Sequence, residues 1–425
     1  MRNRIFNSLW IALDKLFILG GGLLVYILVS NYLGPEFFGV VTFGVAISSI
    51  PIVISQWGGN HTIFNSAIKN GFISYNYIVT SELHRVALYL FISILIIFYL
   101  YFFSDYGEYA FLISMIVLAH VFSGLDLMQY FFDGSIKSKF NAKASMFSKL
   151  VSMTNRALFV GLKVDAFFFF IPYLINNFIS YYYKRLAFNR ETDFVINKAY
   201  KIEFFRVGSP FLISAIFALI YMKVNEVMLA TLTNFSNLAL YNVALTIGFA
   251  WSFIPHAIGL SFIGRGIEQG DEKDQIDSFS CVCFAMIVVS LPFLICLSFF
   301  SEFLVSLLFN SSFSPSASLL PLMSLTALLS TLGVINNRII SSYDGGGQYL
   351  YKKVFVCSFL SIFISYQLIN KFGMHGALYS IFLSEVFSLT IGNYFFRHGL
   401  VLKIHIGLMR FSNLKKCYIS LFSRT

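Results

Sequence analysis

The chain has 425 residues, of which 57% are hydrophobic and 12% charged, about half the roughly 25% charge of ordinary globular chains. Much of the apolar content falls in runs of 18 or more residues, long enough to cross a bilayer as helices, which excludes a soluble enzyme, a coiled coil or a disulfide scaffold. The net charge of +10 would fit nucleic-acid binding only if the cations shared one soluble face, and their positions between the apolar runs favour a membrane protein instead.

The apolar runs predict an all-α integral membrane protein with twelve membrane-spanning helices. The first six are expected at 9–33, 37–57, 86–103, 109–132, 146–162 and 166–183. The second six are expected at 207–232, 238–263, 279–300, 319–336, 354–369 and 376–396. Most of the 8 prolines fall in or at the edge of these spans, so kinked helices are expected.

The positions of Lys and Arg predict the orientation of these helices. If the N-terminus with Arg2 and Arg4 is cytoplasmic, only Lys163 and Lys371 of the 30 Lys and Arg residues fall in outer segments. Four lie inside spans, and all the others fall in cytoplasmic segments; the four are Lys15, Lys149, Arg156 and Lys223. Because cytoplasmic loops carry an excess of Lys and Arg, both termini are predicted to be cytoplasmic.

A charged internal segment divides the spans into two equal sets. We predict an N-terminal six-helix lobe at 1–183, a basic cytoplasmic linker at 184–206, a C-terminal six-helix lobe at 207–396 and a basic cytoplasmic tail at 397–425. Two sets of six spans share one orientation, which is typical of parallel repeats with a substrate path between the lobes. This layout favours a transporter over an enzyme.

Arg156 is the clearest candidate for a functional charge inside the membrane. An ionisable residue at the centre of a span costs about 2.5 to 3.5 kcal/mol to insert, so such a residue is expected to face a cavity or a partner. Lys149, Ser152, Arg156 and Lys163 follow spacings of three, four and seven, which predicts one polar, cationic face on the fifth helix. In the alternative, Lys149 and Lys163 reach the two membrane surfaces and Arg156 pairs with a carboxylate of a neighbouring helix.

The first and seventh spans carry further charges. Lys223 and Glu226 are three residues apart and can meet on one face of a helix, in either a structural or a functional pair. Asp14 and Lys15 are adjacent, hence on different faces, and lie toward the cytoplasmic end of the first span. We expect Lys15 and Lys223, with Lys149, to add positive potential around an anionic substrate.

Four carboxylates are candidates for binding a coupling H⁺ or Na⁺. Asp126 in the fourth span and Glu385 in the twelfth have no oppositely charged neighbour on their own helices, and each could also serve as a counter-ion to Arg156. Asp14 and Glu226 complete the set. The sequence does not choose among them.

No metal site and no cofactor are predicted. His120 and His256 are single histidines within helices and lack a metal-ligand spacing. The run Asp344-Gly345-Gly346-Gly347 lacks the following Lys and the strand-to-helix context of a phosphate-binding P-loop. We therefore expect no use of ATP by this chain.

Several short motifs resemble those of a known transporter family. Leu33-Gly34-Pro35-Glu36-Phe37-Phe38-Gly39 lies between the first two spans and is similar to an LGPexFG turn. The other similar segments follow in order: Val227-Met228-Leu229, Tyr241-Asn242-Val243-Ala244, Trp251-Ser252-Phe253-Ile254-Pro255, Leu307-Leu308-Phe309 and Phe372-Gly373-Met374-His375-Gly376-Ala377. Over nearly the whole chain, this set resembles the polysaccharide repeat-unit flippases (Wzx type) of the multidrug, oligosaccharidyl-lipid and polysaccharide exporter superfamily.

The resemblance implies a MATE-like, two-lobed protein of the bacterial inner membrane. Its substrate would be an undecaprenyl-pyrophosphate-linked oligosaccharide, moved from the cytoplasmic to the periplasmic leaflet for O-antigen or capsule assembly. Its partners would be the lipid bilayer, a coupling ion, and a polysaccharide polymerase with its chain-length regulator. The family commonly has an acidic residue where Glu226 stands. Because an Arg fork matches phosphate oxygens, Arg156 is the first candidate for contact with the pyrophosphate.

Three alternatives remain open on the sequence. Drug and cation exporters of the superfamily share the twelve-span layout but fit the LGPexFG turn less well. A membrane-embedded polymerase would carry a large outer loop, and an acyltransferase would carry a His or Arg constellation at the membrane face; neither feature is visible. A scaffold without transport activity would not explain a cationic face inside a membrane helix.

Overall fold

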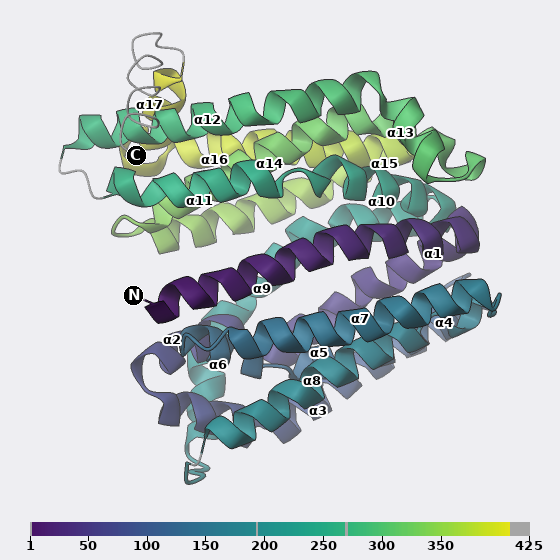
Figure 1. The fold of residues 1–425 in the computed structure, drawn as a ribbon, viewed down its shortest axis with the longest axis horizontal. Coiled ribbons are helices and arrows are strands. Elements are labelled where there is room, and N and C mark those ends of the chain that lie inside the picture. The colour runs from purple at the N-terminus through teal and green to yellow at the C-terminus, as the bar shows by residue number, and fades with distance from the viewer. Residues whose placement is uncertain (1, 193, 268–270, 409–425) are drawn as a thin grey trace. The chain divides into compact units, whose positions relative to one another are not determined.

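The computed structural model describes residues 2–192, 194–267 and 271–408, and it describes the side chains of these residues except those of 2–19, 265 and 266. All the regular secondary structure in these ranges is helical. The chain divides into two compact units, Met1–Ala230 (unit 1) and Thr231–Thr425 (unit 2). Each unit is a bundle of long helices with shorter helices at its ends (Figure 1).

The helices of unit 1 follow one another with short connections. They are α1 (Arg2–Gln56), α2 (Gly59–Lys69), α3 (Gly71–Phe102), α4 (Tyr109–Ala119), α5 (Val121–Leu125), α6 (Met128–Gly134), α7 (Lys139–Gly161), the 3-10 turn η1 (Ala166–Phe168), α8 (Ile171–Glu191) and α9 (Tyr200–Leu232). The closest packing in this unit joins α7 to α8 and to α1.

Unit 2 repeats this pattern of long helices. It contains α10 (Phe235–Ala250), α11 (Phe253–Ile267), α12 (Glu272–Phe299), α13 (Ser301–Leu308), η2 (Ser311–Leu319), α14 (Leu320–Ser341), α15 (Gly346–Leu389), α16 (Ile391–Tyr394), η3 (Phe396–His398) and α17 (Leu400–Gly407). Here α14 packs on α15 and α12, and α11 packs on α12.

Seven helical stretches in the described ranges are long and apolar enough to cross a membrane, or up to eight if α10 and α11, bent by 44°, form one span. Each of the twelve predicted ranges falls largely within helix, because α1 and α15 each cover two of them. Both long helices contain a kink at a glycine with positive φ, Gly34 (φ 69°, ψ 173°) and Gly373 (φ 54°, ψ −127°). Backbone of this kind is readily adopted only by glycine.

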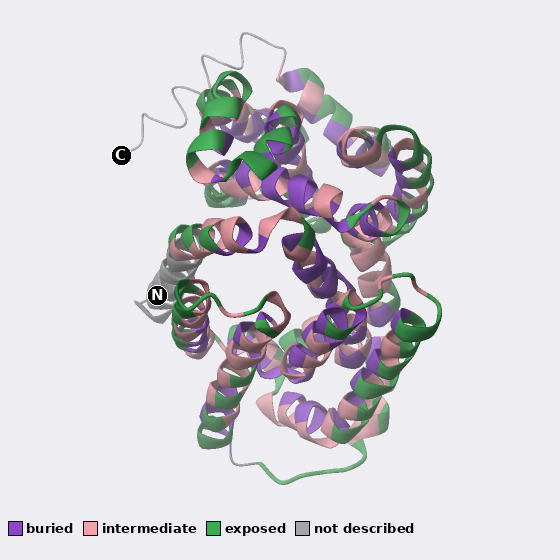
Figure 2. Ribbon diagram, turned by 90° about the vertical axis from the view of Figure 1, so that its right-hand side faces the viewer, coloured by how far each residue is buried: buried purple, intermediate pink, exposed green. Residues whose placement is uncertain are grey.

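The outward faces of the helices are apolar. On α3, for example, Phe91, Ile94, Leu95 and Phe98 are all exposed, while Figure 2 shows buried and exposed residues alternating around the helices. A contiguous exposed apolar face of this extent is typical of contact with lipid. Together with the long apolar helices, it identifies a multi-pass membrane protein.

Nearly all of α9 belongs to the compact unit 1, whereas the sequence predicts that 207–232 belongs to the second lobe. Two glycines explain the contact: a Cβ on Gly58 would lie 2.5 Å from the carbonyl oxygen of Gly208, and one on Gly208 would lie 2.3 Å from that of Trp57. The Trp57 indole also donates to the carbonyl of Phe205 at 3.0 Å. Thus α9 is held against the turn between α1 and α2 by a close backbone approach.

Candidate functional site

Arg156 lies on α7 and is half-buried. The Cζ atom of its guanidinium is 4.3 Å from the ring centroid of Tyr173 on α8, which is a cation–π contact. Among the ion pairs of the described residues, none includes Arg156. Among the side chains that the structure describes, no carboxylate therefore pairs with Arg156.

The packing of α7 on α8 positions this contact. Pro172 occupies the first turn of α8 and its carbonyl accepts a hydrogen bond of 2.9 Å from the buried Ser152 hydroxyl, one turn before Arg156. The ring of His120 lies 5.6 Å from that of Tyr173, and its Nδ1 is 2.8 Å from the carbonyl oxygen of Ile116. The aromatic ring under Arg156 is thus fixed from two sides.

The predicted cationic face of the fifth helix is shorter than expected. Lys149 and Arg156 are both half-buried on α7, seven residues apart and so on the same face. Lys163 does not belong to this face: α7 ends at Gly161, and Lys163 is exposed with a left-handed backbone (φ 53°). The helical spacing does not extend to Lys163 because α7 ends two residues before it, where the N–H of Leu162 makes the last helical bond, to the carbonyl of Leu158 at 2.8 Å.

The pair on α9 forms as the spacing predicts. The Nζ of Lys223 is 2.7 Å from Oε1 of Glu226, with side chains 31% and 8% exposed. Glu226 is thus buried and Lys223 remains partly accessible. Because this carboxylate neutralises the ammonium, Lys223 contributes less positive potential than an unpaired cation would.

Asp126 has a partner that its own helix could not supply. It lies in the break between α5 and α6 and forms a buried ion pair with Lys184 of α8. Its Oδ1 also accepts from the backbone N–H of Gln129 at 3.3 Å. Lys184 stands at the start of the predicted linker, but in the structure α8 continues through it to Glu191. Asp126 is therefore a counter-ion, to Lys184 rather than to Arg156.

Three more charges surround this pair and were missed from the sequence. Arg85 of α3 is fully buried and donates to the carbonyls of Leu125 at 2.8 Å and Ile78 at 3.3 Å. Glu82 binds Arg185 at 3.0 Å and accepts from the Tyr181 hydroxyl at 2.6 Å. We call the following residues the buried ion network, in which Arg85, Asp126 and Lys184 are buried and the other two are partly buried: Glu82, Arg85, Asp126, Lys184 and Arg185.

The buried ion network belongs to a larger set of donors around the broken fourth span. Breaks at His120 and at Asp126 and Leu127 interrupt the regular hydrogen bonds of a helix. Side chains donate to the carbonyls around these breaks, and three of the carbonyls, those of Val117, Ser123 and Leu125, also accept from a backbone N–H. Besides Arg85, the donors to these carbonyls are Tyr89 to Val117 (2.6 Å), Asn177 to Ala119 (3.0 Å), Gln56 to Ser123 (3.0 Å) and Ser55 to Gly124 (3.3 Å). Non-helical backbone at membrane depth is stable only when it is satisfied in this way.

Unit 2 holds the remaining predicted carboxylate. Glu385 is half-buried on α15, and its Oε2 would lie 3.9 Å from a Cβ on Gly333 of α14. Lys353 is not among the predicted site residues; it is buried, and its Nζ donates to Asn337 at 2.7 Å and to Asn393 at 2.9 Å. The side chains of Asp14 and Lys15 lie outside the described residues.

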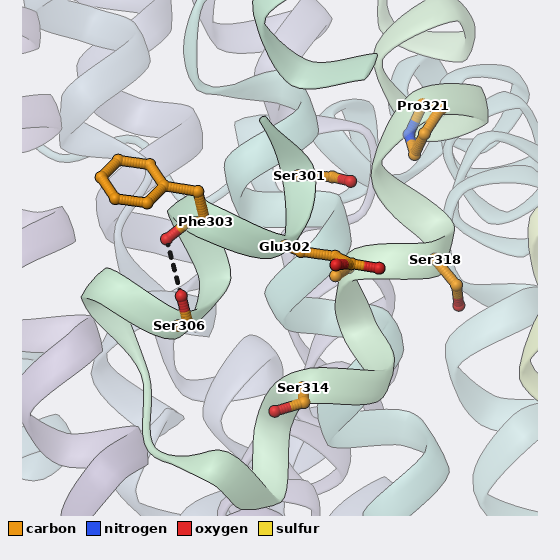
Figure 3. Close-up of a pocket in the computed structure, with 8 residues that line it drawn as sticks. Ser301, Glu302, Phe303, Ser306, Ser314, Ser318 and Pro321 are labelled. Carbon is orange, nitrogen blue, oxygen red and sulfur yellow. Dashed lines mark hydrogen bonds between the residues drawn. The ribbon is translucent and has the colours of Figure 1, made fainter. Parts of the chain in front are cut away.

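A hollow of about 620 Å³ opens in unit 2 between α13, η2 and the start of α14 (Figure 3). Hydroxyl groups of Ser301, Ser306, Ser314 and Ser318 line it, together with the Glu302 carboxylate. Its lining has no cation, so this hollow does not suit an anion. Among the described residues there is also no group of three His, Cys, Asp or Glu side chains that could hold a metal ion.

The fold has well-defined relatives among solved structures. A lipid II flippase MurJ in an inward closed conformation superposes with a TM-score of 0.73 at 12% identity, covering 99% of this chain and 93% of that one. An inward-facing multidrug resistance MATE transporter of the MOP superfamily has a TM-score of 0.62 at 15% identity, with coverages of 94% and 96%. A MOP superfamily transporter from Pyrococcus furiosus has a TM-score of 0.55 at 12% identity, with coverages of 98% and 94%.

The sequence itself carries a family signature. No curated protein sequence matches the chain. However, residues 6–262, more than half of the chain, match the family described as polysaccharide biosynthesis protein. The chain therefore belongs to the polysaccharide biosynthesis protein family and has the fold of the MurJ and MATE transporters.

Proposed function

We propose that this protein is a flippase that moves undecaprenyl-pyrophosphate-linked oligosaccharide repeat units from the cytoplasmic to the periplasmic leaflet of the bacterial inner membrane, for O-antigen or capsule synthesis. The family membership and the MurJ-like fold support a lipid-linked substrate. The observation that carries the proposal is Arg156, a half-buried cation on α7 whose partner among the described side chains is an aromatic ring rather than a carboxylate.

The chemistry of the substrate explains why such a cation is needed. A pyrophosphate loses its hydration when it leaves water, and this loss is prohibitive unless fixed cations replace the water. The planar guanidinium of Arg156 can donate two parallel hydrogen bonds to phosphate oxygens. Lys149 on the same face, with Lys223 and Lys15, would add positive potential, while the prenyl chain stays in lipid.

Glu226 offers a way to couple transport to an ion. Its carboxylate holds Lys223 at 2.7 Å. Protonation of Glu226 would release the ammonium for the pyrophosphate, and loss of the proton would restore the pair and release the substrate. Asp126 is less suited to this role because it is buried against Lys184, and Asp14 and Glu385 remain further candidates.

The direct test is a transport assay in the host of the protein. Deletion of the gene should leave lipid-linked repeat units on the cytoplasmic leaflet and remove the surface polysaccharide. Wild type and Lys163→Ala, which removes an exposed cation beyond the end of α7, should restore both. Arg156→Ala should restore neither at equal membrane levels, and Arg156→Lys should restore part. Full activity of Arg156→Ala would refute the role of this residue.

A cation-coupled drug exporter is the second candidate, because a multidrug resistance MATE transporter shares the fold. The same deletion strain separates the two functions. Unchanged surface polysaccharide together with altered sensitivity to cationic drugs would support the exporter and reject the flippase.

A further inference from the structure

A second cationic site lies at the end of unit 2 where α12 begins and α14 ends. A pocket of about 570 Å³ is lined here by Glu272, Gln275, Tyr343, Arg397, His398, Leu400 and Lys403. All of these residues belong to unit 2. The charge distribution along the sequence predicts that this end faces the cytoplasm.

Arg397 is held in place by its neighbours without losing its charge. Its Cζ is 4.6 Å from the ring centroid of Tyr343, and the Tyr343 hydroxyl donates to Oε1 of Gln275 at 2.6 Å. Burial raises the pKa of Tyr343, so its hydroxyl stays protonated and keeps this hydrogen bond. Among the ion pairs of the described chain, none includes Arg397. The guanidinium is thus oriented while its donors stay exposed.

The backbone at this point adopts an unusual conformation. Arg397 (φ 40°) and His398 (φ 52°) both have positive φ and are followed by Gly399 (φ 82°). Two consecutive non-glycine residues in the left-handed region are unfavourable, and strain of this kind persists where the surrounding structure imposes it. Here that structure is α17, whose Ile404 carbonyl accepts from Ser280 of α12 at 2.8 Å.

Lys403 can add a second cation to the pocket. It pairs with Glu272 at 3.1 Å, but the two side chains are 48% and 64% exposed. An ion pair this exposed is weak, so the ammonium is free to turn toward a stronger anion. With Arg397 and Lys403 against one carboxylate, the pocket suits a phosphate group.

Exposed apolar side chains close in sequence to the two cations indicate where that phosphate comes from. Phe395, two residues before Arg397, is 79% exposed, Leu402 is exposed next to Lys403 on α17, and the exposed Ile406 lines an adjoining pocket together with Lys403. Free phosphate makes no apolar contacts, whereas a phospholipid presents a phosphate next to its acyl chains. Anionic phospholipids attract basic segments at the cytoplasmic face of membranes.

We propose that this pocket binds the phosphate group of an anionic phospholipid, with Arg397 and Lys403 as its ligands and Phe395, Leu402 and Ile406 against the acyl chains. The site would anchor α17 to the inner leaflet. It does not depend on the transported substrate or on Arg156.

The test is the melting temperature of the purified protein in neutral detergent during titration with phosphatidylglycerol. Wild type should show a saturable rise that phosphatidylcholine with the same acyl chains does not produce. In Arg397→Asn the half-saturating lipid concentration should increase about tenfold, as expected for loss of one charge-assisted hydrogen bond. Asn tolerates positive φ, so this variant removes the cation and retains the backbone.

Two further variants make the result decisive. Lys352→Gln removes an exposed cation that does not line the pocket and should respond as wild type does. Lys403→Gln should also weaken the rise in melting temperature with phosphatidylglycerol. This variant tests the proposal independently if Arg397→Asn is poorly folded. An unchanged response in Arg397→Asn and Lys403→Gln, or an equal rise with inorganic phosphate or phosphatidylcholine, would overturn the proposal.

Discussion

The cations of unit 1 fall into two groups with different surroundings. In the buried ion network, Lys184 is paired with Asp126 and Arg85 donates to backbone carbonyls. By contrast, the half-buried guanidinium of Arg156 lies over the ring of Tyr173, and no ion pair of the described residues includes it. Burial alone therefore does not separate a structural charge from a candidate functional one in this membrane protein. The network stabilises the broken fourth span, whereas Arg156 is the cation that we propose for contact with a ligand.

The largest loss of stability is expected for Asp126→Asn. This change leaves the buried Lys184 ammonium without its counter-ion, and breaking a buried pair in this way costs roughly 3–5 kcal/mol. At roughly 2–4 °C per kcal/mol, the melting temperature in detergent should fall by about 6–20 °C. The double variant Asp126→Asn, Lys184→Met should recover much of this loss, and a double variant as unstable as the single one would contradict the pairing.

Arg85→Leu should have the next largest effect. The substitution removes the charged donor to the Leu125 and Ile78 carbonyls, at a cost of about 1.5–3 kcal/mol. The Leu125 carbonyl keeps its bond of 3.0 Å from the backbone N–H of Leu127. Thermal unfolding should show a decrease smaller than that of Asp126→Asn, and proteolysis should increase near the α5–α6 break. A melting temperature equal to that of wild type would show that water or another group replaces the guanidinium at these carbonyls.

Glu226→Gln should reduce stability by only about 1 kcal/mol, because Lys223 is partly exposed and the amide still accepts a hydrogen bond. Its effect on transport should be larger than its effect on stability, since the neutral amide cannot alternate between two charge states. Measurement of both quantities on one preparation checks this. Equally small changes in stability and in transport would show that the pair of Lys223 and Glu226 has a purely structural role.

Arg156→Ala should have the smallest effect on stability, less than about 1 kcal/mol, because it removes one partly exposed cation–π contact. The same variant should have the largest effect on transport. The comparison between the two groups fails if Arg156→Ala unfolds as readily as Asp126→Asn in the same thermal assay. Lys163→Ala is the matched control for this measurement.

The helical architecture could be predicted from the sequence, because runs of apolar residues and the distribution of Lys and Arg are local signals. The contact between Lys223 and Glu226 could be predicted as well, because their positions within one helix are sufficient. The role of Arg156 stays a prediction. Lys163 was wrongly assigned to the face of α7 because periodicity does not reveal where a helix ends.

The buried ion network could not be predicted in the same way. Asp126 and Lys184 are 58 residues apart, and no spacing rule connects them. Lys184 and Arg85 were counted as cytoplasmic loop charges because each lies at the edge of an apolar run, whereas α3 begins at Gly71 and α8 ends at Glu191. One local signal did exist for Arg85, because Ser81 lies four residues before it. In the structure the Nε of Arg85 donates to the Ser81 hydroxyl at 3.1 Å.

The kinks at Gly34 and Gly373 also set the phase of the helices that follow them. Each kink consists of a single glycine between two helical segments. Because there is no loop between these segments, an inserted residue would have to shift the segment that follows. One inserted residue would rotate the next segment by about 100° around its axis, turning its packed face toward lipid. The number of residues from Leu33 to Gly39 therefore fixes both the direction of the following helical segment and its rotation about its own axis. Insertions should be far less tolerated there than in the segment between α8 and α9.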